Sequence, residues 1–212
     1  GRYFSRGQKV MLKKILHKNI LIFSLLIFFQ SNELISENQS ASEWVEGISN
    51  QALVILGNDS LTDLNKMEYL ENIFIKSLDI KRVSLFILGP YRRNLKPSES
   101  SQYFDAIKNF ISNVYAKRLS SYPSGSIEIT KTEDKGKRGI IVSSIITFND
   151  RPNPISIDWW IVPSSTSLYK VFDIRISGIW MAQEQRSTFT SFLSRNNGNI
   201  LNLIKKIESQ KN

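Results

Sequence analysis

Residues 155–161 read ISIDWWI, with an apolar side chain at every second position from Ile155 to Ile161. This period of two is typical of a β-strand that has one face in a hydrophobic core. Similar stretches occupy residues 127–130, 140–148 and 169–176, and short polar segments separate them, at residues 133–137, 149–153 and 163–167. Strands joined by turns this short pair antiparallel with their neighbours. The sequence therefore predicts a meander of about four antiparallel strands.

Helical spacing flanks this meander on both sides. Ser60 is expected to cap the second helix and Asp79 the third, and Pro97 suits the first turn of the fourth. Helices, a meander and helices again predict one α+β domain, in which the helices pack on one face of a curved antiparallel sheet. Apolar residues recur at three- and four-residue steps in the expected helices, which cover residues 44–56, 61–78, 79–88, 97–122, 183–193 and 199–208.

The first 41 residues differ in character from the rest. Met11 precedes a short basic stretch, and residues 20–29 read ILIFSLLIFF without a charge. This pattern is typical of a secretory signal peptide, whereas a bilayer-spanning helix needs about 20 apolar residues. We therefore predict that residues 1–41 are upstream residues and a signal peptide starting at Met11, and that residues 42–212 form an exported domain. An uncleaved membrane anchor and a buried helix are the alternatives.

Composition excludes several kinds of chemistry. The chain has no cysteine, which rules out disulfides and thiolate catalysis, and its one histidine, His17, lies in the predicted signal peptide. Asp158 and Asp173 lie on neighbouring predicted strands, but no histidine accompanies them, so we expect a structural role rather than acid–base catalysis. The net charge of +9 is not gathered into a basic stripe with interleaved aromatics, which argues against nucleic-acid binding. The sequence predicts a protein that is not an enzyme and has no metal or other cofactor.

Three groups of residues are informative through their order and spacing. They are FILGPYRR at 86–93 with PSE at 97–99 and Tyr103, then IDW at 157–159, then YKVFDI at 169–174 with GIWM at 178–181, Gln185-Arg186 and Phe189. Together they resemble the MlaC family of periplasmic phospholipid-binding proteins, over about residues 41–211. Lys96, Trp180 and Thr188 depart from the small residue, serine and glutamate that are usual there in the family.

This resemblance implies a soluble monomeric shuttle that performs no chemistry on its ligand. It would carry a phospholipid between an outer-membrane lipoprotein complex and an inner-membrane ABC transporter, and so maintain the lipid asymmetry of the outer membrane. The acyl tails would lie in an apolar cleft between sheet and helices, with the head group at the mouth. The alternative is a periplasmic adaptor subunit of an ABC transporter that carries no lipid.

The resemblance also guides the choice of residues for the cleft wall. The same side chains are equally suited to an ordinary packed core, and the sequence alone leaves both interpretations open. The expected wall residues are apolar and comprise, from the helices, Val83, Ile87, Phe104, Ile107, Phe110, Ile111 and Val114, and, from the strands and the loop after them, Ile145, Trp159, Val171, Ile174, Ile176 and Met181.

Several polar or aromatic residues are candidates for contacts at the surface. Tyr91, Arg92 and Arg93 follow a helix end, where they either meet a phosphate at the mouth or form a solvated loop. Trp160 is expected to point away from the cleft, either covered by a helix or available for docking. Arg186 is expected to tie the last helices to the sheet or to contact a partner.

Overall fold

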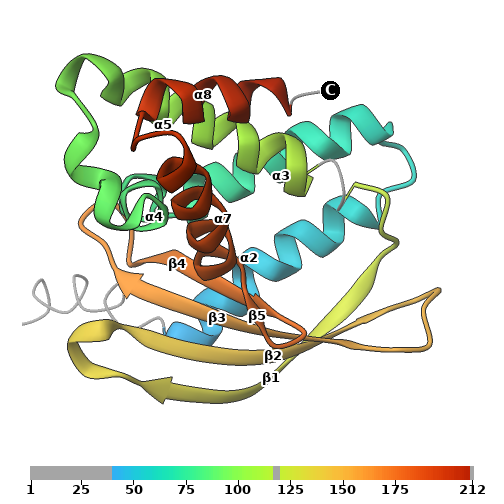
Figure 1. Cartoon of the computed structure of the whole chain (residues 1–212). Coiled ribbons are helices and arrows are strands. Elements are labelled where there is room, and N and C mark those ends of the chain that lie inside the picture. The colour runs from blue at the N-terminus through green and yellow to red at the C-terminus, as the bar shows by residue number, and fades with distance from the viewer. Residues whose placement is uncertain (1–39, 117–119, 211–212) are drawn as a thin grey trace, which may run out of the picture. The chain divides into compact units, whose positions relative to one another are not determined.

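The computed structural model describes residues 40–116 and 120–210 (Figure 1). Of the segment predicted to precede the domain, residues 1–39 lie outside these residues, whereas Ser40 caps α2 and Ala41 is its first, buried residue, so the domain begins slightly earlier than predicted. Helices precede and follow an antiparallel sheet, which confirms the predicted α+β architecture. The helical elements are α2 (Ala41–Leu56), α3 (Asp63–Ser77), α4 (Ile80–Ile87), the 3₁₀ segment η1 (Gly89–Asn94), α5 (Pro97–Ile111), the π-helical turn η2 (Ser112–Ala116), α7 (Met181–Arg195) and α8 (Ile200–Ser209).

Short-range signals fix most of the helix starts. The Asp79 carboxylate accepts the Arg82 N–H at the start of α4, as predicted, and Pro97 occupies the first turn of α5. Ser60 was the wrong cap for α3, because the Thr62 hydroxyl accepts a backbone N–H there instead. Lys96 offers no acceptor before Pro97, but Glu99 accepts the Lys96 N–H at 3.3 Å, which supplies one half of a capping box.

The helix predicted over residues 97–122 is shorter than expected. Regular α-helical hydrogen bonding ends at Ile111, and the chain widens into the π-helical turn η2. A π-turn inserts one extra residue into a helical turn, so the apolar stripe runs on while the helix geometry changes. The Ser112 hydroxyl donates to the carbonyl of Lys108 at 3.0 Å, within the last turn of α5.

The sheet has five strands in the order β1-β2-β3-β4-β5, each antiparallel to its neighbour. Four of them are the predicted ones, and the fifth is a two-residue strand that the prediction omitted. Ser177 (φ 48°) and Gly178 (φ 91°) form the tight turn that brings it back against β4. The bounds are β1 (Gly125–Asp134), β2 (Ile140–Phe148), β3 (Ile155–Pro163), β4 (Tyr169–Ile176) and β5 (Ile179–Trp180).

Strand β4 contains a bulge that changes the side to which its residues point. Trp160 of β3 pairs with Asp173 and the next residue, Ile161, pairs with Val171, so Phe172 is an extra residue without a partner. Val171 and Ile174 consequently lie on the same side, although they are three positions apart, and both pack in the same hydrophobic cluster. Phe172 packs among the helices on the other side.

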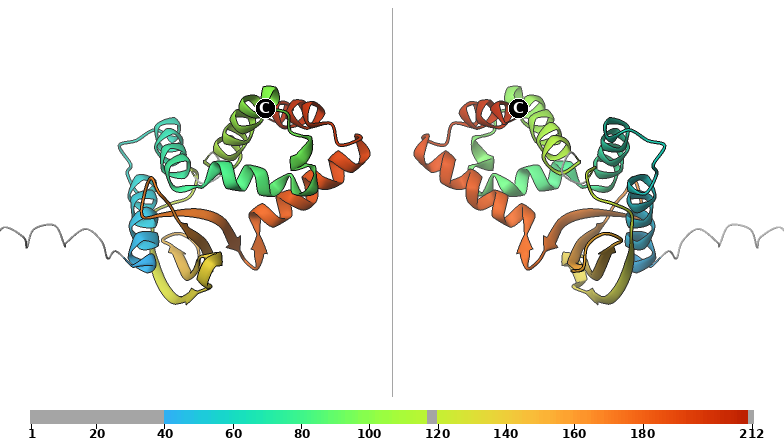
Figure 2. Two further views of the ribbon diagram at one scale, coloured as in Figure 1. Left: turned by 90° about the vertical axis from the view of Figure 1, so that its left-hand side faces the viewer. Right: turned by 90° about the vertical axis from the view of Figure 1, so that its right-hand side faces the viewer.

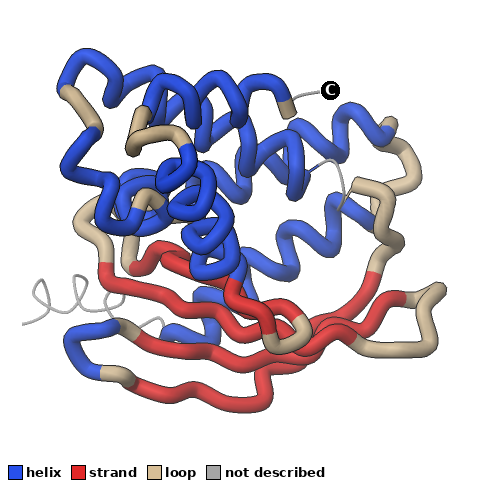
Figure 3. Tube along the Cα trace, viewed as in Figure 1, coloured by secondary structure: helices blue, strands red, loops and turns tan. Residues whose placement is uncertain are grey.

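The described residues bury their apolar side chains in three separate clusters. In the views of Figures 2 and 3 the helices lie over the sheet, with α2 along β1 and β2 and with α4 and α7 packed against β4. The helix cluster joins α4, α5, α7 and α8 around Tyr103 and Leu203. The α2–α3 cluster (Leu53, Leu56, Leu70, Ala116, Ile146, Phe148) and the α2–β4 cluster (Ala41, Val45, Val142, Ile161, Val171) lie on the sheet.

Candidate functional site

The helical residues predicted for the cleft wall fall almost entirely in the helix cluster. Val83, Ile87 and Ile107 are buried within it, and Ile107 has no exposed surface. Phe104, Phe110 and Ile111 are only partly buried and pack against it. The first three are therefore packed core in this structure, whereas the other three keep apolar surface open. Val114, in η2, is also partly exposed and belongs to none of the three clusters.

The sheet residues that keep apolar surface open form a continuous row on β3 and β4, which we call the inner row: Ile155, Ile157, Trp159, Ile174 and Ile176. Ile157 pairs with Ile176 and Trp159 with Ile174, so the row crosses both strands. The first two residues of the row pack on the α2–α3 cluster, and Trp159 and Ile174 on the α2–β4 cluster. All five are only partly buried, although β3 is the central strand.

Polar groups beneath the inner row are fully engaged. The Trp159 indole N–H donates to the Ser144 hydroxyl at 2.9 Å, and that hydroxyl donates to the Ile157 carbonyl at 3.1 Å. Ser144 is buried, so its hydroxyl needs both contacts to offset its removal from water. The inner row thus presents hydrocarbon and a ring face, with its polar atoms turned into the sheet.

The remaining predicted wall residues are not part of the inner row. Val171 is buried in the α2–β4 cluster. Ile145 lies between the buried Ser144 and Ile146 and pairs with the exposed residues Glu128 and Ser156, so it points to the opposite side of β2. Met181 is the first residue of α7 and is partly exposed.

The predicted head-group residues lie in η1. Tyr91 is partly buried against the helix cluster, and Arg92 and Arg93 are exposed in the last turn of the segment. The next residue, Asn94, donates from its side-chain amide to the Gly198 carbonyl at 3.0 Å, which ties η1 to the loop between α7 and α8. The two arginines are therefore carried on a segment that is fixed at its end.

The two carboxylates on neighbouring strands have separate structural contacts. Asp158 accepts the Arg175 Nε–H at 2.6 Å in an ion pair across β3 and β4. Asp173 is buried, and its Oδ1 accepts the backbone N–H of Ile174 and that of Ala182 in the first turn of α7. Burial raises the pKa of Asp173, and the backbone N–H groups oppose this shift. Asp173 thus fixes the start of α7 from the neighbouring strand.

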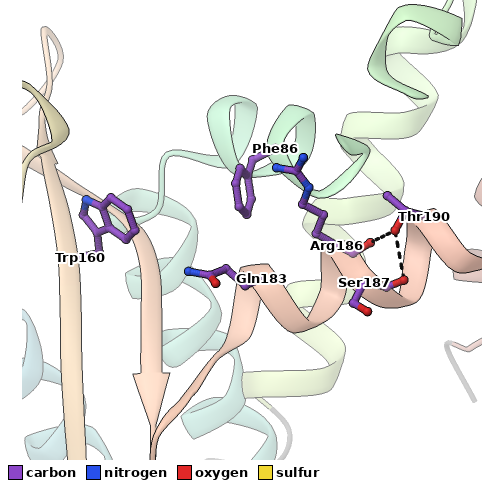
Figure 4. Close-up of a pocket in the computed structure, with 6 residues that line it drawn as sticks. All are labelled: Phe86, Trp160, Gln183, Arg186, Ser187 and Thr190. Carbon is purple, nitrogen blue, oxygen red and sulfur yellow. Dashed lines mark hydrogen bonds between the residues drawn. The ribbon is translucent and has the colours of Figure 1, made fainter. Parts of the chain in front are cut away.

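A cleft of about 530 Å³ lies between α4, α7 and β3, and we call it the α4–α7 cleft (Figure 4). The Arg186 guanidinium lies over the Phe86 ring, 4.8 Å from its centroid. It therefore links α7 to α4, and not to the sheet as the sequence suggested. Trp160 is covered only in part, and its indole N–H donates to the Arg138 carbonyl at 2.6 Å. The lining residues are Phe86, Trp160, Gln183, Arg186, Ser187 and Thr190.

Gly89 of η1 lies close to two residues of α7 that line this cleft. Its φ is +56°, and a Cβ placed on it would lie 2.8 Å from Thr190 Cγ2 and 3.2 Å from Arg186 Nε. Only glycine combines that backbone conformation with that proximity at no steric cost. Of the cleft residues, sequence reasoning singled out Trp160 and Arg186 and missed the other four, because the cleft is assembled from three distant segments.

Two kinds of site are absent from the described part of the chain. Between residues 40 and 116, and between 120 and 210, no helix combines the length and apolar character that crossing a membrane requires. Within the same ranges, no three side chains of the types that bind metal ions gather together.

Comparison with known proteins identifies the family. The family model described as MlaC protein matches residues 46–209. The chain belongs to the MlaC family. Its fold is similar to that of a phospholipid-binding protein from Ralstonia solanacearum, whose structure was solved in complex with a phospholipid. The two chains superpose with a TM-score of 0.71 at 18% sequence identity, over 82% of this chain and 97% of that one.

Family membership confirms the resemblance that the sequence motifs indicated. In this MlaC chain two of those motifs meet in space, because Gly89 of the first lies against Arg186 of the third. The first and third motifs are therefore brought together by the contact between η1 and α7. Trp180, which departs from the family pattern, stacks edge-on against Trp160 with ring centroids 5.7 Å apart.

Proposed function

We propose that this protein is a periplasmic carrier of phospholipid and that the acyl chains lie against the inner row. Family membership over residues 46–209 supports this proposal, as does the similarity in fold to a protein solved with a bound phospholipid. The observation on which the proposal rests is the inner row itself. It is a continuous apolar strip at the centre of the sheet whose side chains all retain open surface.

Hydrophobic burial is sufficient to drive such binding. Each 100 Å² or so of acyl-chain surface removed from water contributes about 2.5 kcal/mol. A pocket for lipid tails needs apolar walls and few polar groups, and the inner row meets this requirement because its indole N–H is bonded to Ser144. Phe104, Phe110, Ile111 and Val114 of α5 and η2 are also partly exposed, and we assign them to the remainder of the pocket wall.

The wider role is that of a shuttle without catalytic activity. The carrier would exchange lipid with an outer-membrane lipoprotein complex and with an inner-membrane ABC transporter, and the transporter would supply the energy by hydrolysing ATP. No step of this role needs a bond to be broken in the lipid. The two carboxylates that catalysis would have used are held by Arg175 and by the first turn of α7.

A pair of neighbouring substitutions on β3 tests the proposal. Ile157→Glu places a carboxylate on the inner row, whereas Ser156→Glu places one on the exposed opposite side of the same strand. Ile107→Asp is less suitable, because a charge at that fully buried position would unfold the helix cluster. Each protein is purified from the periplasm, checked for folding by circular dichroism, and analysed by native mass spectrometry with lipid extraction.

We expect wild type and Ser156→Glu to carry phospholipid. Ile157→Glu should fold but carry at least about tenfold less phospholipid, because a buried unpaired charge costs more than about 1.4 kcal/mol. Equal loading of the two variants would show that the tails do not lie on the inner row. A wild-type protein that is empty, and stays empty with liposomes, would instead favour the adaptor.

A further inference from the structure

We infer that the α4–α7 cleft is a second binding site, which takes an organic anion consisting of a phosphate or carboxylate group on an apolar chain. The inference does not depend on the proposed carrier function. Three features of the cleft support it: an arginine without a carboxylate partner, a fixed aromatic floor, and a polar rim on α7.

Arg186 supplies the positive charge. In the described ranges, no carboxylate lies within ion-pair distance of its guanidinium, and none of the six lining residues is acidic. The guanidinium lies over the Phe86 ring, and this contact orients it without using its N–H donors. A guanidinium presents several N–H donors in a plane, and this geometry matches a phosphate or carboxylate. The most suitable ligand group is therefore an anion.

The floor of the cleft consists of aromatic rings that hold one another in place. Phe172, the bulged residue of β4, contacts Phe86 on one side and Trp160 on the other, with ring centroids 5.1 Å and 5.3 Å apart. Because the Trp160 N–H is already bonded to the Arg138 carbonyl, the indole offers the cleft only apolar surface. Such rings favour an alkyl chain or a flat apolar group over a small hydrated ion.

The rim adds hydrogen-bonding groups beside the cation. Gln183 and Ser187 are four residues apart on α7, so their side chains are neighbours on the exposed surface of the helix (Figure 4). The Thr190 hydroxyl donates to the carbonyls of Arg186 and Ser187, which leaves its methyl group towards Gly89. The Gln183 amide and the Ser187 hydroxyl line the same cleft as the guanidinium and can donate to the oxygen atoms of an anionic head.

The cleft and the inner row lie on different sides of β3. Trp159 belongs to the inner row, and the next residue, Trp160, points the opposite way, towards α4 and α7. A ligand in the cleft therefore contacts a different tryptophan from a ligand on the inner row. This difference allows an experiment to separate the two sites.

The test uses the purified protein labelled with 5-fluorotryptophan, in which fluorine NMR reports on each of the four tryptophans. The probe is n-octyl phosphate. Two control ligands separate the contribution of the charged group from that of the alkyl chain. The first, n-octyl glucoside, has the same chain without the charge, and the second, inorganic phosphate, has the charge without the chain. Trp159→Phe and Trp160→Phe assign the two neighbouring signals. Arg186→Gln removes the cation, and Arg195→Gln is the matched control, an exposed arginine at the end of the same helix.

We expect n-octyl phosphate to shift the Trp160 signal, and the dissociation constant to rise at least about tenfold in Arg186→Gln but to stay within about twofold in Arg195→Gln. Both control ligands should bind more weakly. Equal affinity of Arg186→Gln and wild type, a shift confined to Trp159, or equal binding of either control ligand would overturn the inference.

A comparison of lipid-loaded with lipid-stripped protein identifies the natural source of the anion. Binding of n-octyl phosphate only to stripped protein would indicate that a co-purified lipid already occupies the cleft. Binding to both would indicate a separate organic anion. Either result supports the site, and failure to bind in both states refutes it, whatever phospholipid the inner row carries.

Discussion

Replacing Gly89 by alanine is expected to destabilise the domain through two effects that can be separated. The positive φ of 56° costs an L-residue about 1–2 kcal/mol. The new Cβ would also lie 2.8 Å from Thr190 Cγ2 and 3.2 Å from Arg186 Nε, so one of these side chains must move. Overpacking of this kind costs a further 1–3 kcal/mol or so. The expected loss in the free energy of unfolding is therefore about 2–5 kcal/mol.

Gly136→Ala provides the matched control. Gly136 has a nearly identical φ of 60°, but a Cβ there would have no heavy atom within 4 Å. This variant should show the backbone cost alone, about 1–2 kcal/mol. The difference between the two variants then measures the contact between η1 and α7.

Urea unfolding followed by circular dichroism gives both free energies, and thermal melting should show a fall of about 2–4 °C for each kcal/mol lost. The n-octyl phosphate titration described above should be weakened by Gly89→Ala and unaffected by Gly136→Ala. If both alanine variants lose the same stability, the close approach of Gly89 to α7 is not a real constraint, and the explanation given for this glycine is wrong.

Two further predictions concern buried polar groups. Tyr103 is fully buried, and its hydroxyl donates a hydrogen bond to the Ser84 carbonyl at 2.7 Å. Tyr103→Phe should therefore lower the free energy of unfolding by about 1–3 kcal/mol. An unchanged urea midpoint would contradict this prediction. Because burial raises the pKa of Asp173, its contribution to stability is greatest at low pH and is lost as pH rises through the folded-state pKa. Asp173→Asn should therefore gain stability relative to wild type as the pH rises above about 4, the ordinary pKa of an aspartate, and a pH-independent difference in urea unfolding would refute this.

Local signals in the sequence predicted most of the fold. Asp79 and Pro97 act over one helical turn, so the positions where α4 and α5 begin could be predicted from the neighbouring residues. The end of α5 could not, because the apolar stripe continues through η2 and periodicity does not register the change to a π-turn. Strand β5 is only two residues long, too short for alternation, although the Ser-Gly pair at 177–178 is a turn signal.

The site was less predictable, because periodicity indicates which side a residue faces but not whether that side is filled. Ile107 and Phe104 lie on one helix and both suited a wall, yet the first is fully buried and the second is not. This difference in burial depends on which residues of α5 are covered by α7 and α8, and the tertiary packing of the helices determines that. The α4–α7 cleft was missed for a related reason: Phe86 and Gln183 are almost a hundred positions apart, and no local pattern connects them.

The bulge at Phe172 makes the backbone register of β4 as important as its composition. With this extra residue, Ile174 and Ile176 belong to the inner row while Phe172 faces the helices. If the same residues alternated strictly from Val171 without the bulge, the two sides of the strand beyond Phe172 would be exchanged. Asp173 and Arg175 would then replace two isoleucines on the apolar strip. The bulge thus keeps two charged side chains away from the surface where the acyl chains are proposed to lie, and deleting Phe172 itself would leave Asp173, Ile174 and Arg175 on their present sides.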